Sequence, residues 1–263
     1  MPDFDSHQPG TFCWPELTTT DQKAAVAFYR DLFGWGLNEQ PAGPDQVYSM
    51  FQVRGRDVAA ASSMQPEQRA QGVPAYWGSY VAATSADVSV AKAASLGATV
   101  LAPPFDVMDV GRMAILQDPT GAMFSLWQAR KHIGARVLNE PGALCWTELS
   151  TKDPSAAEKF YTALFGWTAK SSAMGDMGAY TEFGAEGTTV GGMMKMPASM
   201  ENAPSYWMPY FYVGSCNAAV ARAKELGARV YVQPTDIPGE RGRFAILADP
   251  QGAAFGVFTR DGQ

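Results

Sequence analysis

The sequence predicts an α+β protein made of two similar halves, each folding a curved sheet with helices outside. Three observations predict this class. Motifs of the first half return in the second half at a nearly constant distance along the chain. Within each half, residues that alternate as in strands give way to stretches with helical periodicity and cap residues. The chain has 263 residues, of which 46% are hydrophobic and 17% charged, a balance typical of globular domains.

The repeat is carried by motifs of several residues. Residues 13–17 (CWPEL) return as 145–149 (CWTEL), and residues 32–35 (LFGW) return as 164–167, both 132 positions later. Residues 111–124 (GRMAILQDPTGAMF) return as 242–255 (GRFAILADPQGAAF), 131 positions later. We therefore expect an N-terminal domain over 10–130, a linker over 131–141 and a C-terminal domain over 142–260.

The first part of each half predicts a strand, a helix and two further strands. Residues 11–19 alternate as in a strand, and Asp21 is placed to cap a helix whose apolar face includes Phe28 and Phe33. Gly34 ends this helix. Short strands are expected at about 46–53 and 57–64.

The second part of each half repeats this order. A strand over 76–83 leads to a helix over 85–96 that Gly97 stops, followed by a short strand near 99–101 and a hairpin over 111–127. The turn of that hairpin, residues 118–121 (DPTG), suits a type I turn. Each half therefore contains the order βαβββ twice, and the whole chain contains four such units.

This order resembles that of a known family. The Asp-x(6)-Phe-Tyr pattern of the first helix, its Leu-Phe-Gly-Trp ending and the Asp-Pro-x-Gly hairpin are similar to those of vicinal-oxygen-chelate proteins, namely glyoxalases, bleomycin-resistance proteins and extradiol dioxygenases. The chain most resembles two-domain actinobacterial members that are labelled glyoxalases or hydroxylases. The resemblance covers nearly the whole chain. It implies that paired units curl into two half-open, barrel-like sheets with helices outside and a ligand-binding concave face inside.

Strand alternation predicts which side chains face each concave surface, because residues two apart share one side of a strand. Leu17 and Leu149 are expected beneath the helices. The inward side chains are then Trp14, Glu16, Tyr48, Met50 and Tyr80 in the first half, and Trp146, Glu148, Tyr180, Glu182, Met208, Tyr210 and Tyr212 in the second.

The hairpins are expected to add an arginine and an aromatic residue to each concave face. If each turn is a two-residue hairpin, Arg112 lies opposite Trp127, and Arg243 lies opposite Phe258. A different loop length would reverse this assignment. Each half would then enclose a carboxylate and an arginine among aromatic rings, Glu16 with Arg112 and Glu148 with Arg243. Such a carboxylate is a candidate general base, but the same pairs also fit ion pairs that stabilise the sheets.

The metal ligands of the family are missing at the positions where the resemblance implies them. Metal-using members carry His, Gln or Glu seven residues before the helix-capping Asp and seven after the Asp of the hairpin turn. Those positions hold Trp14 and Trp146, and Ser125 and Gly256; the usual second-unit position falls near Gly78 and Met208. His7 and His132 are expected outside the cavities, in the N-terminal tail and the linker. We therefore expect no metal and no cofactor, with a carboxylate site at Glu148 and Glu182 as the alternative.

The two cavities are expected to differ. Where the first should hold Met50, Ala82, Met123, Ser125 and Ala59-Ala60, the second should hold Glu182, Tyr212, Ala254, Gly256 and Gly191-Gly192. Smaller walls and more ionisable groups favour the second cavity as the working one. Glu148 and Glu182 are candidate acid and base partners, Tyr210 or Tyr212 a candidate proton donor or ligand anchor, and Arg243 a candidate anion clamp.

Two main functions follow from these expectations. The first is a metal-independent enzyme that transfers protons on an aromatic or polyketide-like metabolite, as an isomerase, cyclase, lyase or tailoring enzyme and less as an oxygenase. The second is a bleomycin-resistance-like protein that sequesters a small hydrophobic or aromatic ligand without chemistry, through Trp146, Tyr180 and Phe258. A third is an interaction module whose cavities are filled by its own side chains.

Composition excludes several other classes. The longest apolar runs, such as 113–116, are far shorter than the roughly 20 residues of a membrane span, and residues 1–10 do not resemble a signal peptide, so we expect a cytoplasmic protein. The net charge of −6 argues against nucleic acid as a partner. Four units can complete two barrels within one chain, which allows a monomer or a homodimer. The cysteines, Cys13, Cys145 and Cys216, are expected to be buried and unpaired.

Overall fold

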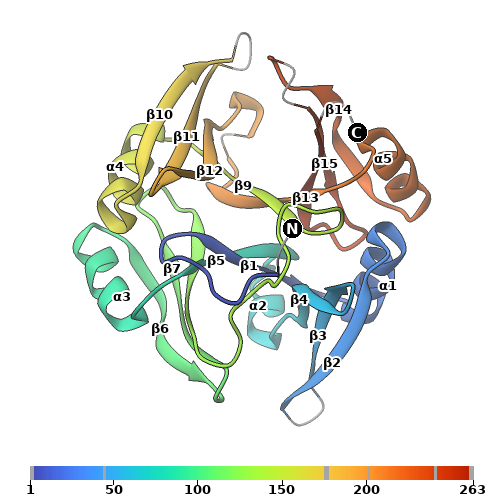
Figure 1. The fold of residues 1–263 in the computed structure, drawn as a ribbon, viewed down its shortest axis with the longest axis horizontal. Coiled ribbons are helices and arrows are strands. Elements are labelled where there is room, and N and C mark those ends of the chain that lie inside the picture. The colour runs from blue at the N-terminus through green and yellow to red at the C-terminus, as the bar shows by residue number, and fades with distance from the viewer. Residues whose placement is uncertain (1–2, 44–45, 175–177, 201, 240–241, 261–263) are drawn as a thin grey trace.

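The computed structural model describes residues 3–43, 46–174, 178–200, 202–239 and 242–260. Each half of this described chain forms one eight-stranded sheet, and the two sheets have the same strand order. Helices cover the outer faces, as expected for tandem βαβββ units (Figure 1). No helix in the described ranges is both long and apolar enough to cross a membrane.

The first sheet has the strand order β2-β3-β4-β1-β5-β8-β7-β6. Two of its strands were not expected in full, and both are edge strands that carry proline, which leaves a weak alternation pattern. Strand β2 has no counterpart among the expected strands, and β6 continues beyond 101 through Pro103 and Pro104. The elements of this half are β1 (Phe12–Thr19), α1 (Gln22–Phe33), β2 (Gly36–Gly43), β3 (Gln46–Val53), β4 (Arg56–Ser63), α2 (Pro66–Ala70), β5 (Tyr76–Ala82), α3 (Ala86–Ser95), β6 (Thr99–Val107), β7 (Gly111–Gln117) and β8 (Met123–Ala129).

The second sheet has the strand order β10-β11-β12-β9-β13-β16-β15-β14. In both sheets the first strand of each unit lies at the centre, so β9 pairs antiparallel with β13 as β1 pairs with β5. The elements of this half are β9 (Leu144–Thr151), α4 (Pro154–Phe165), β10 (Thr168–Ala173), β11 (Ala179–Ala185), β12 (Thr188–Lys195), the 3-10 helix η2 (Ala198–Met200), β13 (Tyr206–Tyr212), α5 (Cys216–Glu225), β14 (Arg229–Asp236), β15 (Arg243–Ala248) and β16 (Ala254–Thr259).

The ends of α1 and α4 follow from the repeated motifs. The Asp21 carboxylate accepts a hydrogen bond from the Ala24 amide at 3.0 Å, and Asp153 accepts one from the Ala156 amide at 3.0 Å. Such a side chain satisfies an amide that has no partner within the helix. At the other end of α1, Gly34 adopts φ +70°, a left-handed conformation that glycine reaches without strain.

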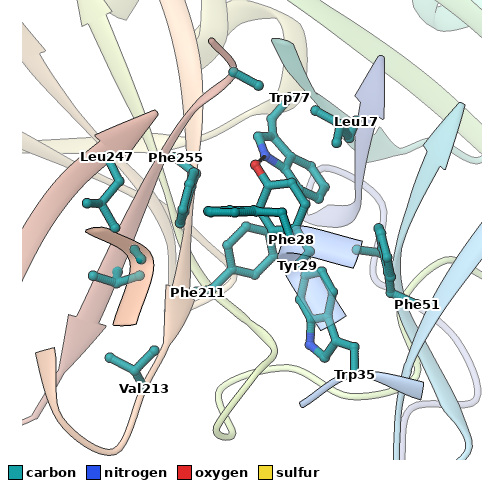
Figure 2. Packing of buried hydrophobic residues seen from close by; sticks show 14 of the residues in the cluster. Leu17, Phe28, Tyr29, Trp35, Phe51, Trp77, Phe211, Val213, Leu247 and Phe255 are labelled. Atoms are coloured by element: carbon teal, nitrogen blue, oxygen red, sulfur yellow. Dashed lines mark hydrogen bonds between the residues drawn. The ribbon is translucent and has the colours of Figure 1, made fainter. Parts of the chain in front are cut away.

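Helices α1 and α4 pack between the outer sheet faces of the two halves. Helix α1 lies beside α5, and α3 lies beside α4 (Figure 1). Figure 2 shows the result in one core, where Phe28 and Tyr29 of α1 contact Phe211 and Phe255 of the second half. A second core pairs α4 with β7 and β8 in the same way. Each helix therefore stabilises both halves at once.

The motifs that define the repeat form the interface between the halves. The Tyr29 hydroxyl donates to the Asp249 carboxylate at 3.0 Å, and the Tyr161 hydroxyl donates to Asp118 at 2.8 Å. Each hydroxyl also accepts from a buried indole N–H, that of Trp77 or Trp207. The Phe-Tyr and Asp-Pro-x-Gly motifs thus hold the two halves together. The concave faces are left for ligands.

Candidate functional site

A continuous cavity of about 2910 Å³ takes in the concave faces of both sheets, together with part of the N-terminal tail and the linker. It is larger than a typical single ligand pocket because it spans both halves. Most of the expected site residues line it: Trp14, Glu16, Trp127, Trp146, Glu148, Tyr180, Glu182, Tyr210 and Phe258. The residues expected beneath the helices, Leu17 and Leu149, are fully buried on the opposite face, and so are Phe51 and Phe183.

Glu148 lies at the centre of the second cavity and is held by two tyrosines. Its Oε2 accepts from the Tyr180 hydroxyl at 2.8 Å, and its Oε1 accepts from the Tyr210 hydroxyl at 3.0 Å. The Trp146 indole N–H in turn donates to the Tyr180 oxygen at 2.8 Å. Because Tyr180 already accepts from Trp146, its own proton is directed to the carboxylate. This chain of hydrogen bonds fixes Glu148 as an acceptor.

Glu16 has the same surroundings in the first cavity, with one hydroxyl more. It accepts from Tyr48 at 3.0 Å, from Tyr80 at 2.9 Å and from Ser62 at 3.0 Å. Met194 takes the place of Ser62 in the second half, 132 positions later. Among the residues that the structure describes, Glu148 therefore has two hydrogen-bond donors where Glu16 has three.

Burial raises the pKa of both carboxyl groups, because each is removed from water among aromatic side chains. The hydroxyl donors oppose this shift, since they stabilise the ionised form, and Glu16 has one such donor more than Glu148. Burial and the adjacent Glu148 also hold the pKa of the Tyr210 phenol well above its usual range. Tyr210 is therefore a neutral donor at physiological pH.

Two glycines of the second cavity make room for its tyrosines. A Cβ at Gly192 would lie 2.0 Å from the Tyr180 oxygen, and one at Gly256 would lie 2.0 Å from the Tyr210 ring. The first half has Ala60 and Ser125 at these positions. The expectation that small walls enlarge the second cavity is therefore wrong at these two points, because the tyrosine rings occupy the space and are positioned by it.

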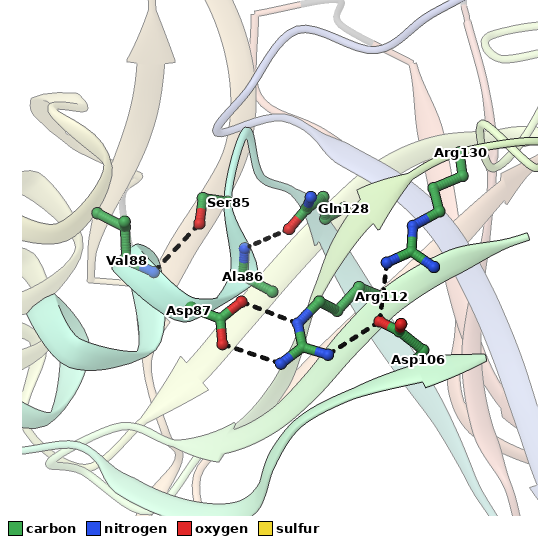
Figure 3. Close-up of polar contacts among 8 residues, drawn as sticks. All are labelled: Ser85, Ala86, Asp87, Val88, Asp106, Arg112, Gln128 and Arg130. Carbon is green, nitrogen blue, oxygen red and sulfur yellow. Dashed lines mark hydrogen bonds and ion pairs between the residues drawn. The ribbon is translucent and has the colours of Figure 1, made fainter. Parts of the chain in front are cut away.

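The expected place of Arg112 inside the first cavity is wrong. Arg112 pairs with Gln128, one position from the expected register, because the turn spans five residues and closes with a hydrogen bond from the Asp118 amide to the Ala122 carbonyl. Figure 3 shows the arginine on the outer side. There it binds Asp87 through two hydrogen bonds and Asp106 through a third, at 2.8–2.9 Å.

Arg243 and Tyr212 also lie outside the second cavity. Arg243 pairs with Thr259 instead of Phe258 and donates to Asp236 at 2.7 and 3.1 Å, so it is not an anion clamp for a ligand in this cavity. Tyr212 is buried at the end of β13, where its ring packs against Phe258 with centroids 6.2 Å apart. It does not line the cavity.

The linker places an imidazole inside the first cavity, contrary to expectation. The ring of His132 packs edge to face on Trp14, with centroids 4.8 Å apart, and on Trp127, with centroids 6.0 Å apart. The Trp127 indole N–H donates to the His132 carbonyl at 2.8 Å. His7 of the tail also lines the cavity and hydrogen-bonds the Ala135 carbonyl at 2.7 Å.

The described residues do not fit a metal ion of the kind that the family uses. No three His, Cys, Asp or Glu side chains come together within the described ranges. Glu148 and Glu182 face the same side of the sheet, but Gly192 of the intervening strand separates them, and the Tyr180 hydroxyl lies over that glycine. A phenol therefore occupies the space where a cation shared by the two carboxylates would lie.

The residues of the site that were not predicted include Ser62, Tyr206 and His132. Ser62 could have been found from strand alternation, since it shares a face with Ala60. Tyr206 lines the cavity near Glu148, and its repetition of Tyr76 was the available signal. His132 gave no signal, because a linker without secondary structure has no periodicity that assigns a side chain to a face.

Comparisons with known proteins agree with this architecture. Residues 11–126 match the family described as the glyoxalase/bleomycin resistance protein/dioxygenase superfamily, and residues 146–258 match the glyoxalase-like domain. Two solved structures share the fold at 16% identity. The Mn(II)-bound glyoxalase from Novosphingobium aromaticivorans has a TM-score of 0.66, covering 96% of this chain and 82% of its own. The 2,3-dioxygenase LapB from Pseudomonas sp. KL28 has a TM-score of 0.64, covering 95% and 91%.

Two proteins with similar sequences span nearly the whole chain. The Mycobacterium tuberculosis protein named "Putative glyoxylase CFP32" is 43% identical over 258 residues, which cover 98% of this chain and 97% of its own. The anthracycline biosynthesis protein DnrV of Streptomyces peucetius is 35% identical over 260 residues, which cover 95% and 93%. With both halves matched in sequence and in fold, the chain belongs to the vicinal-oxygen-chelate superfamily of glyoxalases, bleomycin resistance proteins and dioxygenases.

Proposed function

We propose that the chain is a metal-independent enzyme that transfers a proton on a flat aromatic or polyketide-like metabolite in its second cavity. The observation that carries the proposal is the state of Glu148. It is a half-buried carboxylate whose pKa is raised by desolvation, it is oriented by two phenols, and it lacks the third hydroxyl donor that Glu16 receives from Ser62. A raised pKa makes a carboxylate a stronger base once it is ionised.

The chemistry requires no co-reactant. Glu148 takes a proton from an acidic C–H bond of the substrate, and the electron pair of that bond stays on the substrate as an enolate or phenolate. In the free protein the neutral phenol of Tyr210 donates its proton to Glu148; once Glu148 has taken the substrate proton, the phenol is released to donate a hydrogen bond to such an oxygen. Return of the same proton to a different carbon completes an isomerisation. Its transfer to the alkoxide that ring closure forms completes a cyclisation, and its transfer to the departing group completes an elimination.

The relatives support the substrate class. The protein DnrV is named for anthracycline biosynthesis, and so is the DauV protein of Streptomyces sp. strain C5, which is also 35% identical. The apolar and aromatic lining of the second cavity suits a flat aromatic substrate. That the chain is an enzyme, and that it works without a metal ion, are both parts of this proposal.

The test uses 1,8-dihydroxyanthrone, a tricyclic phenol with an acidic methylene group, under nitrogen in deuterated buffer. Exchange of the methylene protons is followed by NMR. The wild-type chain should accelerate exchange, and Glu148→Gln should lower that acceleration about 100-fold or more. Glu16→Gln is the matched control and should leave it unchanged. Equal losses in both variants, or stoichiometric zinc, manganese, iron or nickel in the active protein, would overturn the proposal.

Sequestration of a ligand without chemistry is the second candidate. The observation that favours it is that Tyr180 and Tyr210 already satisfy both oxygens of Glu148, which gives a closed polar network in an apolar pocket. A wild-type chain that binds 1,8-dihydroxyanthrone tightly but does not accelerate exchange would support this second function.

A further inference from the structure

The His132 imidazole occupies a site between two aromatic side chains of the first cavity. It lies on Trp14 and Trp127 at angles of 83° and 82°, the edge-to-face geometry that aromatic pairs prefer. The Gly134 amide donates to its Nδ1 at 3.2 Å, which leaves the ring proton on Nε2. Nε2 is buried and has no hydrogen-bond partner in the described part of the chain. Contacts with the Trp14 and Trp127 rings therefore hold much of the imidazole in place.

The linker also seals that site from water. Ala135 is fully buried in one cluster with Trp14 and Trp127, which belong to the walls of the first cavity. Trp14 is 4% exposed, and Trp127 is 7% exposed. A segment of the chain thus fills part of the first cavity in the way a bound molecule would.

The second cavity repeats these aromatic walls, and among the described residues they are less covered than those of the first. Trp146 repeats Trp14, and Phe258 repeats Trp127. Both side chains are only half-buried. Within the described ranges, no buried cluster forms around Trp146 as one forms around Trp14. The two walls face the cavity from β9 and β16, on either side of β13.

We infer that His132 marks, in the first half, the position that an aromatic ring of the ligand takes between Trp146 and Phe258 in the second half. The inference rests on the proposed function for the choice of cavity. Beyond that function, it states where a ring of the ligand binds and that the ligand is aromatic. The histidine ring acts as an internal stand-in for that ligand, because the duplication preserved both walls in both halves.

The geometry favours a ligand with more than one fused ring. Trp146 and Glu148 are two residues apart on β9, which separates their Cα atoms by about 7 Å at the rise of a β-strand. A ligand that packs against Trp146 and donates an acidic proton to Glu148 must span this distance. The described lining carries two lysine or arginine side chains, Lys131 and Arg260, and both are exposed. The end of the ligand near Glu148 is therefore not anionic before proton transfer.

Binding of 1,8-dihydroxyanthraquinone, a flat tricyclic phenol, tests the inference by isothermal titration calorimetry. The wild-type chain should bind one equivalent, and phenol, which has a single ring, should bind at least about 100-fold more weakly, since little apolar surface is buried. Phe258→Ala should raise the Kd about tenfold by removing one wall of the ring site. Arg243→Gln, which lies outside the cavity, should leave the Kd unchanged. Phe258→Leu keeps the apolar volume and should give an intermediate Kd if Phe258→Ala is poorly folded.

The possible results separate this inference from the proposed function. An unchanged Kd in both Phe258 variants would overturn the ring site, even if Glu148→Gln still abolishes exchange of the anthrone. A raised Kd in Phe258→Ala together with no exchange in the wild-type chain would support the ring site and overturn the enzymatic function. Equal binding of phenol and the anthraquinone would overturn the requirement for fused rings.

Discussion

The two concave faces of this chain share their aromatic walls and their central glutamate, but only the first is covered by the linker. Trp14 is sealed beneath His132, while Trp146 is half-buried. Glu16 accepts three hydroxyl donors, and Glu148 accepts two. The duplication therefore kept the scaffold of a site in both halves, and small differences between the halves decide which copy is open to a ligand.

The outer faces show the opposite behaviour. The Tyr29 and Asp249 pair has its counterpart in Tyr161 and Asp118, with oxygen distances of 3.0 and 2.8 Å. These buried groups hold the halves together, so both copies are needed for stability. Symmetry is therefore kept where the halves support each other and is lost where a ligand is expected.

The largest effect is expected from closing the space beneath Tyr180. In Gly192→Ala the new methyl group would lie 2.0 Å from the Tyr180 oxygen, so the phenol must shift from its present position against Glu148. Because misplacing a catalytic group by about 1 Å can lower a rate about 100-fold, we expect a loss of that size in anthrone exchange. The matched change in the first half, Ala60→Gly, should leave exchange unchanged. A fully active Gly192→Ala would show that Tyr180 does not position the carboxylate.

The next effect concerns the symmetric interface. Tyr29→Phe removes the donor to Oδ2 of Asp249 and the acceptor of the Trp77 indole, and Tyr161→Phe does the same at Asp118 and Trp207. Each variant should lose about 2–4 kcal/mol of unfolding free energy in urea titrations. The two losses should be similar. A large loss in one variant and none in the other would contradict the symmetric role of these pairs.

The pH dependence of exchange should report Glu148. A general base must be ionised, so the rate rises with pH through the pKa of Glu148, which burial raises above 4.5. In Tyr180→Phe the carboxylate loses a hydrogen bond that favours its ionised form. The rising limb should therefore move to higher pH in this variant. A limb that stays in place in rate profiles from pH 4 to 9 would assign it to another group.

The smallest effect is expected from the plug itself. His132→Ala removes the ring from Trp14 and Trp127 and should cost about 1 kcal/mol of stability, the scale of aromatic pairs. Trp14 should become more accessible, which red-shifts the tryptophan emission and increases quenching by acrylamide. Unchanged quenching would mean that the rest of the linker, including Ala135, seals Trp14 without the imidazole.

Much of the fold could be predicted because local rules and the repeat agree. The caps Asp21 and Gly34 and the inward side of Glu16 and Glu148 all follow from spacing alone. The arginines could not be placed, because one amide hydrogen bond across a five-residue turn shifts every residue of a strand to the other face. The position of His132 depends on tertiary contacts of a linker, which no periodic pattern records.

A crystal structure of the chain soaked with 1,8-dihydroxyanthraquinone tests the central claim most directly. We expect one molecule in the second cavity, with one ring between Trp146 and Phe258 and a hydroxyl oxygen within hydrogen-bond distance of Glu148. The first cavity should keep His132 in contact with Trp14. Density for the ligand in the first cavity beside Glu16, with the second cavity empty, would contradict the account.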